Sequence, residues 1–182
     1  MPKSKHIVIW AVLLLLFSAC QETRKEQDAL FQSLDAATTG VDFSNTITET
    51  EAVNYFTYPY LYMGGGVAIG DLNNDGLQDL YFTSNMESNK LYLNQTQKGS
   101  SLQFEDITDS AGVGGDRRWD TGVTMADVNG DGLLDIYVSV SGKWENTANL
   151  LYINNGNLTF TEKAAQFGLA DAGNSTQASF FD

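Results

Sequence analysis

Residues 66–82 read GVAIGDLNNDGLQDLYF, and residues 122–138 read GVTMADVNGDGLLDIYV. The offset between these two stretches, from Gly66 to Gly122, is the same as the offset from Phe104 to Phe160 and from Gly112 to Gly168. A third match, NKLYLN at 89–94 and NLLYIN at 149–154, is shifted by four additional residues, as expected of a surface loop of variable length. Self-similarity at a fixed period indicates a repeat architecture.

Each repeat contains about four short apolar runs with β-branched and aromatic residues, which predict β-strands. About four strands in roughly 55 residues are typical of a blade of an all-β propeller. We expect a lead-in at 39–63 and repeats at 64–119 and 120–174. TQASFFD at 176–182 aligns with TGVTMAD at 121–127, so we expect a third repeat to start at 175–182 and the chain to be the N-terminal fragment of a longer protein.

The centre of each repeat has the pattern D-x-N-x-D-G-x-x-D, which places oxygen donors along one side of a tight loop. Three carboxylates in one loop repel each other unless a cation lies between them. Oxygen donors in this number suit Ca²⁺ better than Mg²⁺, so we predict two calcium sites. The predicted ligands are Asp71, Asn73, Asp75, the carbonyl of Leu77 and Asp79, and then Asp127, Asn129, Asp131, the carbonyl of Leu133 and Asp135. Asp182 would be the first ligand of a third site.

Two other interpretations of these loops are an EF-hand and a turn without a metal. An EF-hand needs a glutamate at position 12 and flanking helices, but that position is Phe82 in one copy and Val138 in the other. A metal-free Asp/Asn/Gly turn remains possible for a single copy. Two copies in register, each with an aspartate at position nine, favour a metal.

The N-terminus has the features of an export signal. Basic Lys3 and Lys5 precede an apolar run at 7–17, which is too short to span a bilayer, and Ser-Ala-Cys follows at 18–20. We expect a lipoprotein signal peptide at 1–19, lipidation of Cys20, and a polar tether at 20–38 with a short helix near 29–34. An ordinary cleavable signal is the alternative.

Composition excludes several function classes. The net charge of −13 makes nucleic acid an unsuitable partner. Cleavage before Cys20 removes His6, the one histidine, which excludes histidine-dependent catalytic triads and histidine-ligated zinc in this segment. A carboxylate-based glycosidase would need a pair of acids, and the candidates outside the loops have no distinguishing context: Asp106, Asp109, Asp116 and Asp120.

Aromatic residues gather in the strand-like segment 40–62, and the run Tyr55–Tyr62 is the densest. This run would serve as a platform for sugars or, more simply, pack against a sheet. Trp119 and Trp144 lie near expected loops and allow the same two roles, with packing favoured.

The two repeats, with TGVDFSN at 39–45, GGGV at 64–67 and FEDITDSAGV at 104–113, resemble the FG-GAP/VCBS repeats of integrin-α-like propellers, especially the cartilage acidic protein/UnbV-type group. The resemblance implies a seven-bladed ring with calcium in the acidic loops. We therefore expect a calcium-stabilised binding or adhesion module and not an enzyme, with an unknown protein or glycan ligand. We expect it to be held at the outer membrane or cell surface of a Gram-negative bacterium. The alternative is part of a carbohydrate-processing enzyme with its catalytic residues elsewhere or beyond Asp182.

Overall fold

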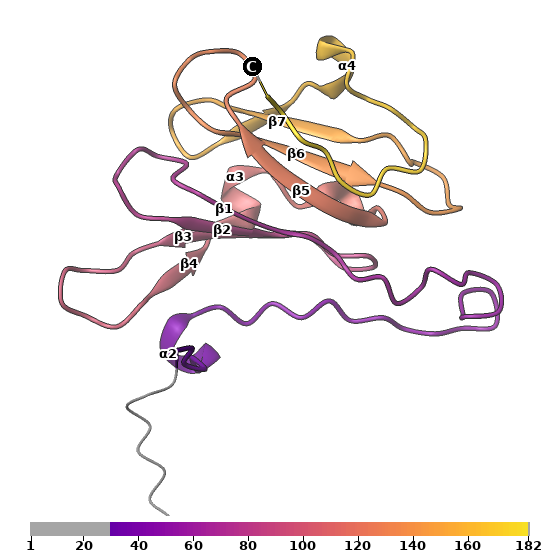
Figure 1. The fold of residues 1–182 in the computed structure, drawn as a ribbon, viewed down its shortest axis with the longest axis horizontal. Helices are drawn as coiled ribbons and strands as arrows, with labels where there is room; N and C mark the ends of the chain where they lie inside the picture. Colours follow the sequence, from indigo (N-terminus) through magenta and orange to yellow (C-terminus); the bar gives the residue numbers. More distant parts are fainter. Residues whose placement is uncertain (1–29, 182) are drawn as a thin grey trace, which may run out of the picture. The chain divides into compact units, whose positions relative to one another are not determined.

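The computed structural model describes residues 30–181. The expected signal peptide at 1–19, the lipidation site Cys20 and the possible ligand Asp182 lie outside these residues. The described part contains two four-stranded antiparallel sheets, each with its strands in chain order (Figure 1). This confirms the predicted all-β fold with blades of four strands.

The first sheet, here called blade 1, is followed by the short helix α3 (Thr108–Ala111) and the 3₁₀ turn η2 (Gly115–Arg117). The strands of blade 1 are β1 (Val67–Gly70), β2 (Asp79–Phe82), β3 (Lys90–Asn94) and β4 (Phe104–Asp106).

The second sheet, blade 2, repeats this plan and is followed by helix α4 (Ala164–Phe167). Its strands are β5 (Asp120–Ala126), β6 (Asp135–Val140), β7 (Leu150–Asn154) and β8 (Phe160–Glu162). The first residues of β2 and β6, of β4 and β8, and of α3 and α4 are all separated by the offset seen in the sequence. The separation between the starts of β3 and β7 is larger, as the shifted third match predicted.

The core lies between the blades, because each sheet is apolar on the face that meets its neighbour. Tyr81 of β2 points from blade 1 into a buried cluster with Val123, Ile136 and Val138 of blade 2. Its counterpart Tyr137 belongs to a second cluster on the far face of blade 2. Each repeat therefore buries one face against the next, which is how stacked repeats share a continuous core.

The inner strands of the repeats approach closely through glycines. A Cβ at Gly66 would lie 2.9 Å from the Cα of Gly122, and a Cβ at Gly122 would overlap the carbonyl oxygen of Thr176. The segment that follows α4 thus lies beside β5 as β5 lies beside β1. Thr124 Oγ1 donates to the carbonyl of Ala178 at 2.7 Å and fixes this arrangement.

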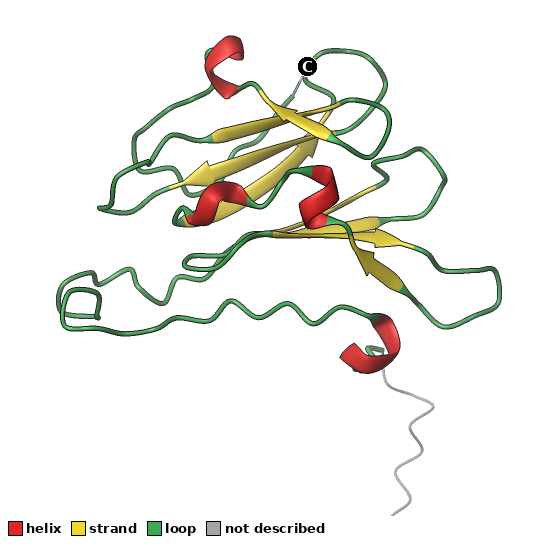
Figure 2. Ribbon diagram, turned by 180° about the vertical axis from the view of Figure 1, so that it is seen from behind, coloured by secondary structure: helices red, strands yellow, loops and turns green. Residues whose placement is uncertain are grey.

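Two expectations for the N-terminal part are wrong. Residues 30–35 are not helical; the helix α2 spans Ala36–Thr39, capped by Asp35 and ended by Gly40 at φ 79°. Residues 40–66 contain no strand, and bends and turns occupy most of 51–63; both views show this segment running along blade 1 (Figures 1 and 2). No helix within residues 30–181 is long and apolar enough to cross a membrane.

Candidate functional site

The first acidic loop connects β1 to β2 and is closed by its own side chains. The carboxylate of Asp71 accepts hydrogen bonds from the backbone N–H groups of Gly76 at 2.8 Å and Asp75 at 3.1 Å. Asp75 Oδ1 accepts from the N–H of Leu77 at 2.8 Å, and Asn73 Nδ2 donates to Asp75 Oδ2 at 2.9 Å. The side chains predicted to be ligands at positions one, three and five therefore share one compact turn.

The second acidic loop connects β5 to β6 and has the same hydrogen bonds. Asp127 accepts from the N–H groups of Gly132 at 2.8 Å and Asp131 at 3.1 Å, and Asp131 Oδ1 accepts from Leu133 N–H at 2.9 Å. Asn129 Nδ2 again donates to the position-five carboxylate, at 2.9 Å. Hydrogen bonds from backbone N–H groups, of which that from Gly132 has the largest effect, lower the pKa of Asp127. This carboxyl group is therefore ionised at neutral pH.

Left-handed backbone at two positions explains the residue types of the loops. The sixth position is Gly76 in one loop and Gly132 in the other, both at φ 86°, where a side chain would be strained. The fourth position is Asn74 at φ 59° and Gly130 at φ 77°. Each loop joins two antiparallel strands, so neither is the helix–loop–helix of an EF-hand.

The aspartate at position nine joins each acidic loop to the sheet. Asp79 is fully buried, and its two oxygens accept from the N–H groups of Leu72 and Asn94, each at 2.9 Å. Burial raises the pKa of Asp79 despite these hydrogen bonds, and the nearby negative charges of Asp75 and Asp71 raise it further. Asp79 thus has a structural role that position-based reasoning did not identify.

Asp135 makes the equivalent contacts in blade 2. Its oxygens accept from Val128 N–H at 3.0 Å and Asn154 N–H at 2.8 Å. The side chain of Asn154 also donates to the carbonyl of Leu72, at 2.8 Å, in the first acidic loop. The acidic loops of neighbouring blades are therefore held in a fixed relation.

The chemistry of each loop fits a divalent cation with oxygen ligands. Both loops offer three carboxylates and an asparagine oxygen, and each carboxylate oxygen can accept more than one contact. Within residues 30–181 the ion pairs are Lys90–Asp106 and Arg118–Asp116, so no lysine or arginine neutralises the loops there. No group of three or more His, Cys, Asp or Glu side chains in this part of the chain is already arranged to hold a metal. The assignment of the ten predicted ligands stays a prediction.

A buried carboxyl group, Asp120, lies where the two blades meet. Only 1% of it is exposed; Asp120 Oδ2 accepts from Asn89 Nδ2 at 2.6 Å, and Oδ1 has no partner in the described residues. Burial raises the pKa of Asp120 to about 7, although Asn89 and the charge of Arg118 oppose the shift and Asp116 adds to it. The equivalent of the Asn89–Asp120 hydrogen bond in blade 2 is the donation from Asn149 Nδ2 to Ser175 Oγ, at 2.9 Å.

The other candidate carboxylates for catalysis are exposed, unlike Asp120. Burial raises the pKa of Asp106, but hydrogen bonds from Lys90 and Thr108 outweigh burial and lower it overall. Asp109 and Asp116 are exposed on α3 and η2. Asp106 lines a pocket with Lys90 and Arg117 that does not include Asp120, and the hypothesis of an enzyme stays untested.

The two tryptophans pack with the lead-in segment. Trp119 and Trp144 stack with ring centroids 4.5 Å apart, and Tyr58 meets both edge-on at 5.3 and 5.0 Å. Trp119 is buried, whereas Tyr60 is 61% exposed. Packing is therefore the role of the tryptophans, as favoured from the sequence, while Tyr60 keeps an open ring face.

Comparison with known proteins agrees with this geometry. Residues 57–138, which contain β1 to β5 and most of β6, match the FG-GAP-like repeat model. These residues are similar in sequence to FG-GAP-like repeats. A curated relative, cartilage acidic protein 1 of Xenopus tropicalis, is 36% identical over 108 residues. That match covers 58% of this chain and 16% of the relative, so the chain spans a small part of the relative's length.

The FG-GAP-like repeats explain the correspondence between the blades. The family match ends inside β6, but the matched strands, the helices α3 and α4 and the equivalent hydrogen bonds extend the same repeat through blade 2. The acidic loops occupy the same position, between the first and second strands, in both FG-GAP-like repeats.

Proposed function

We propose that this chain is a calcium-stabilised extracellular binding module built on FG-GAP-like repeats. The observation that carries the proposal is the presence of two acidic loops with matching hydrogen-bond patterns and no basic partner among residues 30–181. All three aspartates of each loop accept backbone amides, but these hydrogen bonds leave the negative charges of the carboxylates uncompensated. Three carboxylates in each loop point to a cation that offsets their repulsion.

In the first loop, the metal would be held by Asp71, Asn73, Asp75, the Leu77 carbonyl and Asp79. The second loop offers the corresponding set: Asp127, Asn129, Asp131, the Leu133 carbonyl and Asp135. Bound Ca²⁺ would fix the connection between the first two strands of each blade. Because the unfolded chain does not present these donors together, the ion stabilises the folded state by mass action.

The sequence of the N-terminus supports a location of the module outside the cytoplasm. A signal at 1–19 and a lipid on Cys20 would place the module outside the cytoplasm, at the outer membrane or cell surface. Extracellular calcium at millimolar concentration is sufficient even for weak sites of this kind. A protein or a glycan is the proposed ligand of the module.

Thermal unfolding with and without a chelator tests the proposal. A free calcium concentration one hundredfold above Kd stabilises by about 2.7 kcal/mol per site. At about 2–4 °C per kcal/mol for a domain of this size, chelation should lower Tm by about 5–10 °C per site.

Asp75→Asn and Asp131→Asn should each reduce that shift, whereas Asp109→Asn, which removes an exposed charge on α3, should not. An unchanged Tm in chelator, with no metal by elemental analysis, would contradict the proposal.

A further inference from the structure

We infer that the face of the blades opposite the acidic loops holds a binding site for a neutral carbohydrate. The inference deepens the proposed function by naming a site and a ligand class. A pocket of about 480 Å³ opens there, within the range of about 300–1,000 Å³ typical of small-molecule sites. It lies beside the first residues of β5 and the end of β6, whereas the acidic loops lie at the other ends of the first and second strands.

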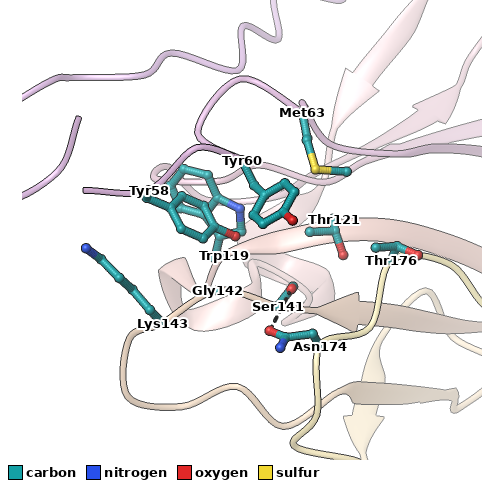
Figure 3. Close-up of a pocket in the computed structure, with 10 residues that line it drawn as sticks. All are labelled: Tyr58, Tyr60, Met63, Trp119, Thr121, Ser141, Gly142, Lys143, Asn174 and Thr176. Carbon is teal, nitrogen blue, oxygen red and sulfur yellow. Dashed lines mark hydrogen bonds between the residues drawn. The ribbon is translucent and has the colours of Figure 1, made fainter. Parts of the chain in front are cut away.

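Four segments that are distant in sequence build this pocket. The lead-in contributes Tyr58, Tyr60 and Met63, and the chain at the start of β5 contributes Trp119 and Thr121 (Figure 3). The β6–β7 connection contributes residues 141–143, and the segment after α4 contributes Asn174 and Thr176. The β6–β7 connection is the place where blade 2 is longer than blade 1. An insertion in a surface loop on a fixed framework is a common origin of a binding site.

One wall of the pocket is aromatic. Tyr60 is 61% exposed, and its ring centroid lies 5.8 Å from that of Tyr58. Tyr58 in turn packs against Trp119. This packing orients Tyr58 before any ligand binds, which lowers the entropy cost of binding. An open aromatic ring face suits the C–H face of a sugar ring.

The opposite wall offers neutral hydrogen-bonding groups. Ser141 Oγ donates to Asn174 Oδ1 at 3.3 Å, which orients the amide (Figure 3). Within residues 30–181, neither Asn174 Nδ2 nor the hydroxyl of Thr176 donates to another residue. Amide and hydroxyl groups that face an aromatic wall match the hydroxyl groups at the rim of a sugar ring.

The negative charge of the whole chain, together with the engagement of the one cationic side chain of the pocket, favours a neutral ligand over an acidic one. The lining contains no carboxylate, and its one charged group, Lys143, donates from Nζ to the carbonyl of Thr57 at 3.0 Å. This lysine therefore holds the lead-in in place. The chain as a whole has a net charge of −13, which repels anionic polymers.

Glycan binding by the full-length protein in calcium tests the inference. The probes are immobilised neutral oligosaccharides (β-glucan, xylan, mannan and chitin fragments), with uronic-acid and sulfated glycans beside them. Hits are titrated by calorimetry. We expect at least one neutral glycan to bind. Tyr60→Ala and Asn174→Ala should each weaken it by about tenfold or more, equivalent to about 1.4 kcal/mol.

Phe56→Ala is the matched control, because Phe56 is an aromatic residue of the same lead-in that is 94% exposed and does not line the pocket. It should leave binding unchanged, and Tyr60→Phe should retain most of it. Circular dichroism checks that each variant is folded.

The inference is overturned if the folded protein binds no neutral glycan, binds only acidic glycans, or binds equally well after Tyr60→Ala and Asn174→Ala. Failure of the proposed function has a different signature. If chelation leaves Tm unchanged while glycan binding persists, the calcium proposal fails and the pocket stands. If chelation lowers Tm and no glycan binds, the carbohydrate inference fails and the calcium proposal stands.

Discussion

Replacing Asp120 by asparagine isolates the effect of one buried carboxyl group on the pH dependence of stability. Burial raises the pKa of Asp120 from its usual 3.8 to about 7 in the folded protein. The folded state thus binds the proton more tightly than the unfolded state. The free energy of unfolding therefore falls as pH rises from about 4 to about 7 and levels off above. A difference of about three pKa units corresponds to about 4 kcal/mol.

Asp120→Asn removes this ionisation but keeps a side-chain oxygen that accepts the hydrogen bond from Asn89. Between pH 5 and pH 8, the stability of the variant relative to the native protein should therefore rise by about 2–3 kcal/mol. Urea unfolding at pH 5, 6, 7 and 8 in constant calcium measures the difference. Asp109→Asn, at an exposed position, should run parallel to the native protein at every pH. Parallel curves for Asp120→Asn as well would refute the assignment of a raised pKa to this group.

Two further substitutions test how the blades are joined. Asn154→Ala leaves the buried carbonyl of Leu72 without its donor and should lower the free energy of unfolding by about 2–3 kcal/mol, measured in urea. The control is the exposed neighbour: Asn155→Ala should lower the free energy of unfolding by less than about 1 kcal/mol. Equal effects of the two substitutions would argue against the hydrogen bond between the blades. Gly122→Ala introduces a Cβ that overlaps the backbone of the next repeat and should cost about 1–3 kcal/mol in thermal melts. Gly173→Ala, whose Cβ would have ordinary contacts, should be nearly neutral. A Gly122→Ala protein as stable as the native one would show that the backbone at Thr176 does not pack against Gly122.

The blades were predictable because their determinants are local and occur twice. Each strand is a short apolar run, and the constant offset between the two copies pairs the strands of one blade with those of the other in the sequence alone. The position of the acidic loops between two strands followed from Phe82 and Val138, which are strand residues where an EF-hand requires glutamate.

The lead-in was not predictable from aromatic content, because local side-chain hydrogen bonds compete with strand pairing. Asn54 Nδ2 donates to the carbonyls of Thr50 and Glu51, and Asn54 Oδ1 accepts from the N–H groups of Phe56 and Thr57. These bonds wind residues 50–57 into turns. The helix shifted from its predicted position for a similar reason, since Asp35 and Gly40 supply the caps that an isolated short helix needs.

The contacts between repeats could not be predicted because they join residues far apart in sequence. Asn89 and Asp120 belong to different blades, and so do Leu72 and Asn154. The carboxylate pattern revealed the loops but not the second role of Asp79, whose oxygens hold two backbone amides. A pattern of residue types shows which carboxylates are near each other in sequence. It does not show from which backbone amides their oxygens accept hydrogen bonds.

Calcium stoichiometry in the native protein and in loop variants tests the central claim most directly. Isothermal titration of metal-free protein should show calcium binding at both described loops. Asp75→Asn should remove one site, Asp131→Asn the other, and Glu105→Gln, at an exposed position on β4, neither. Titrations that show no calcium binding, or a number of sites unchanged by Asp75→Asn and Asp131→Asn, would contradict the assignment of calcium to these loops.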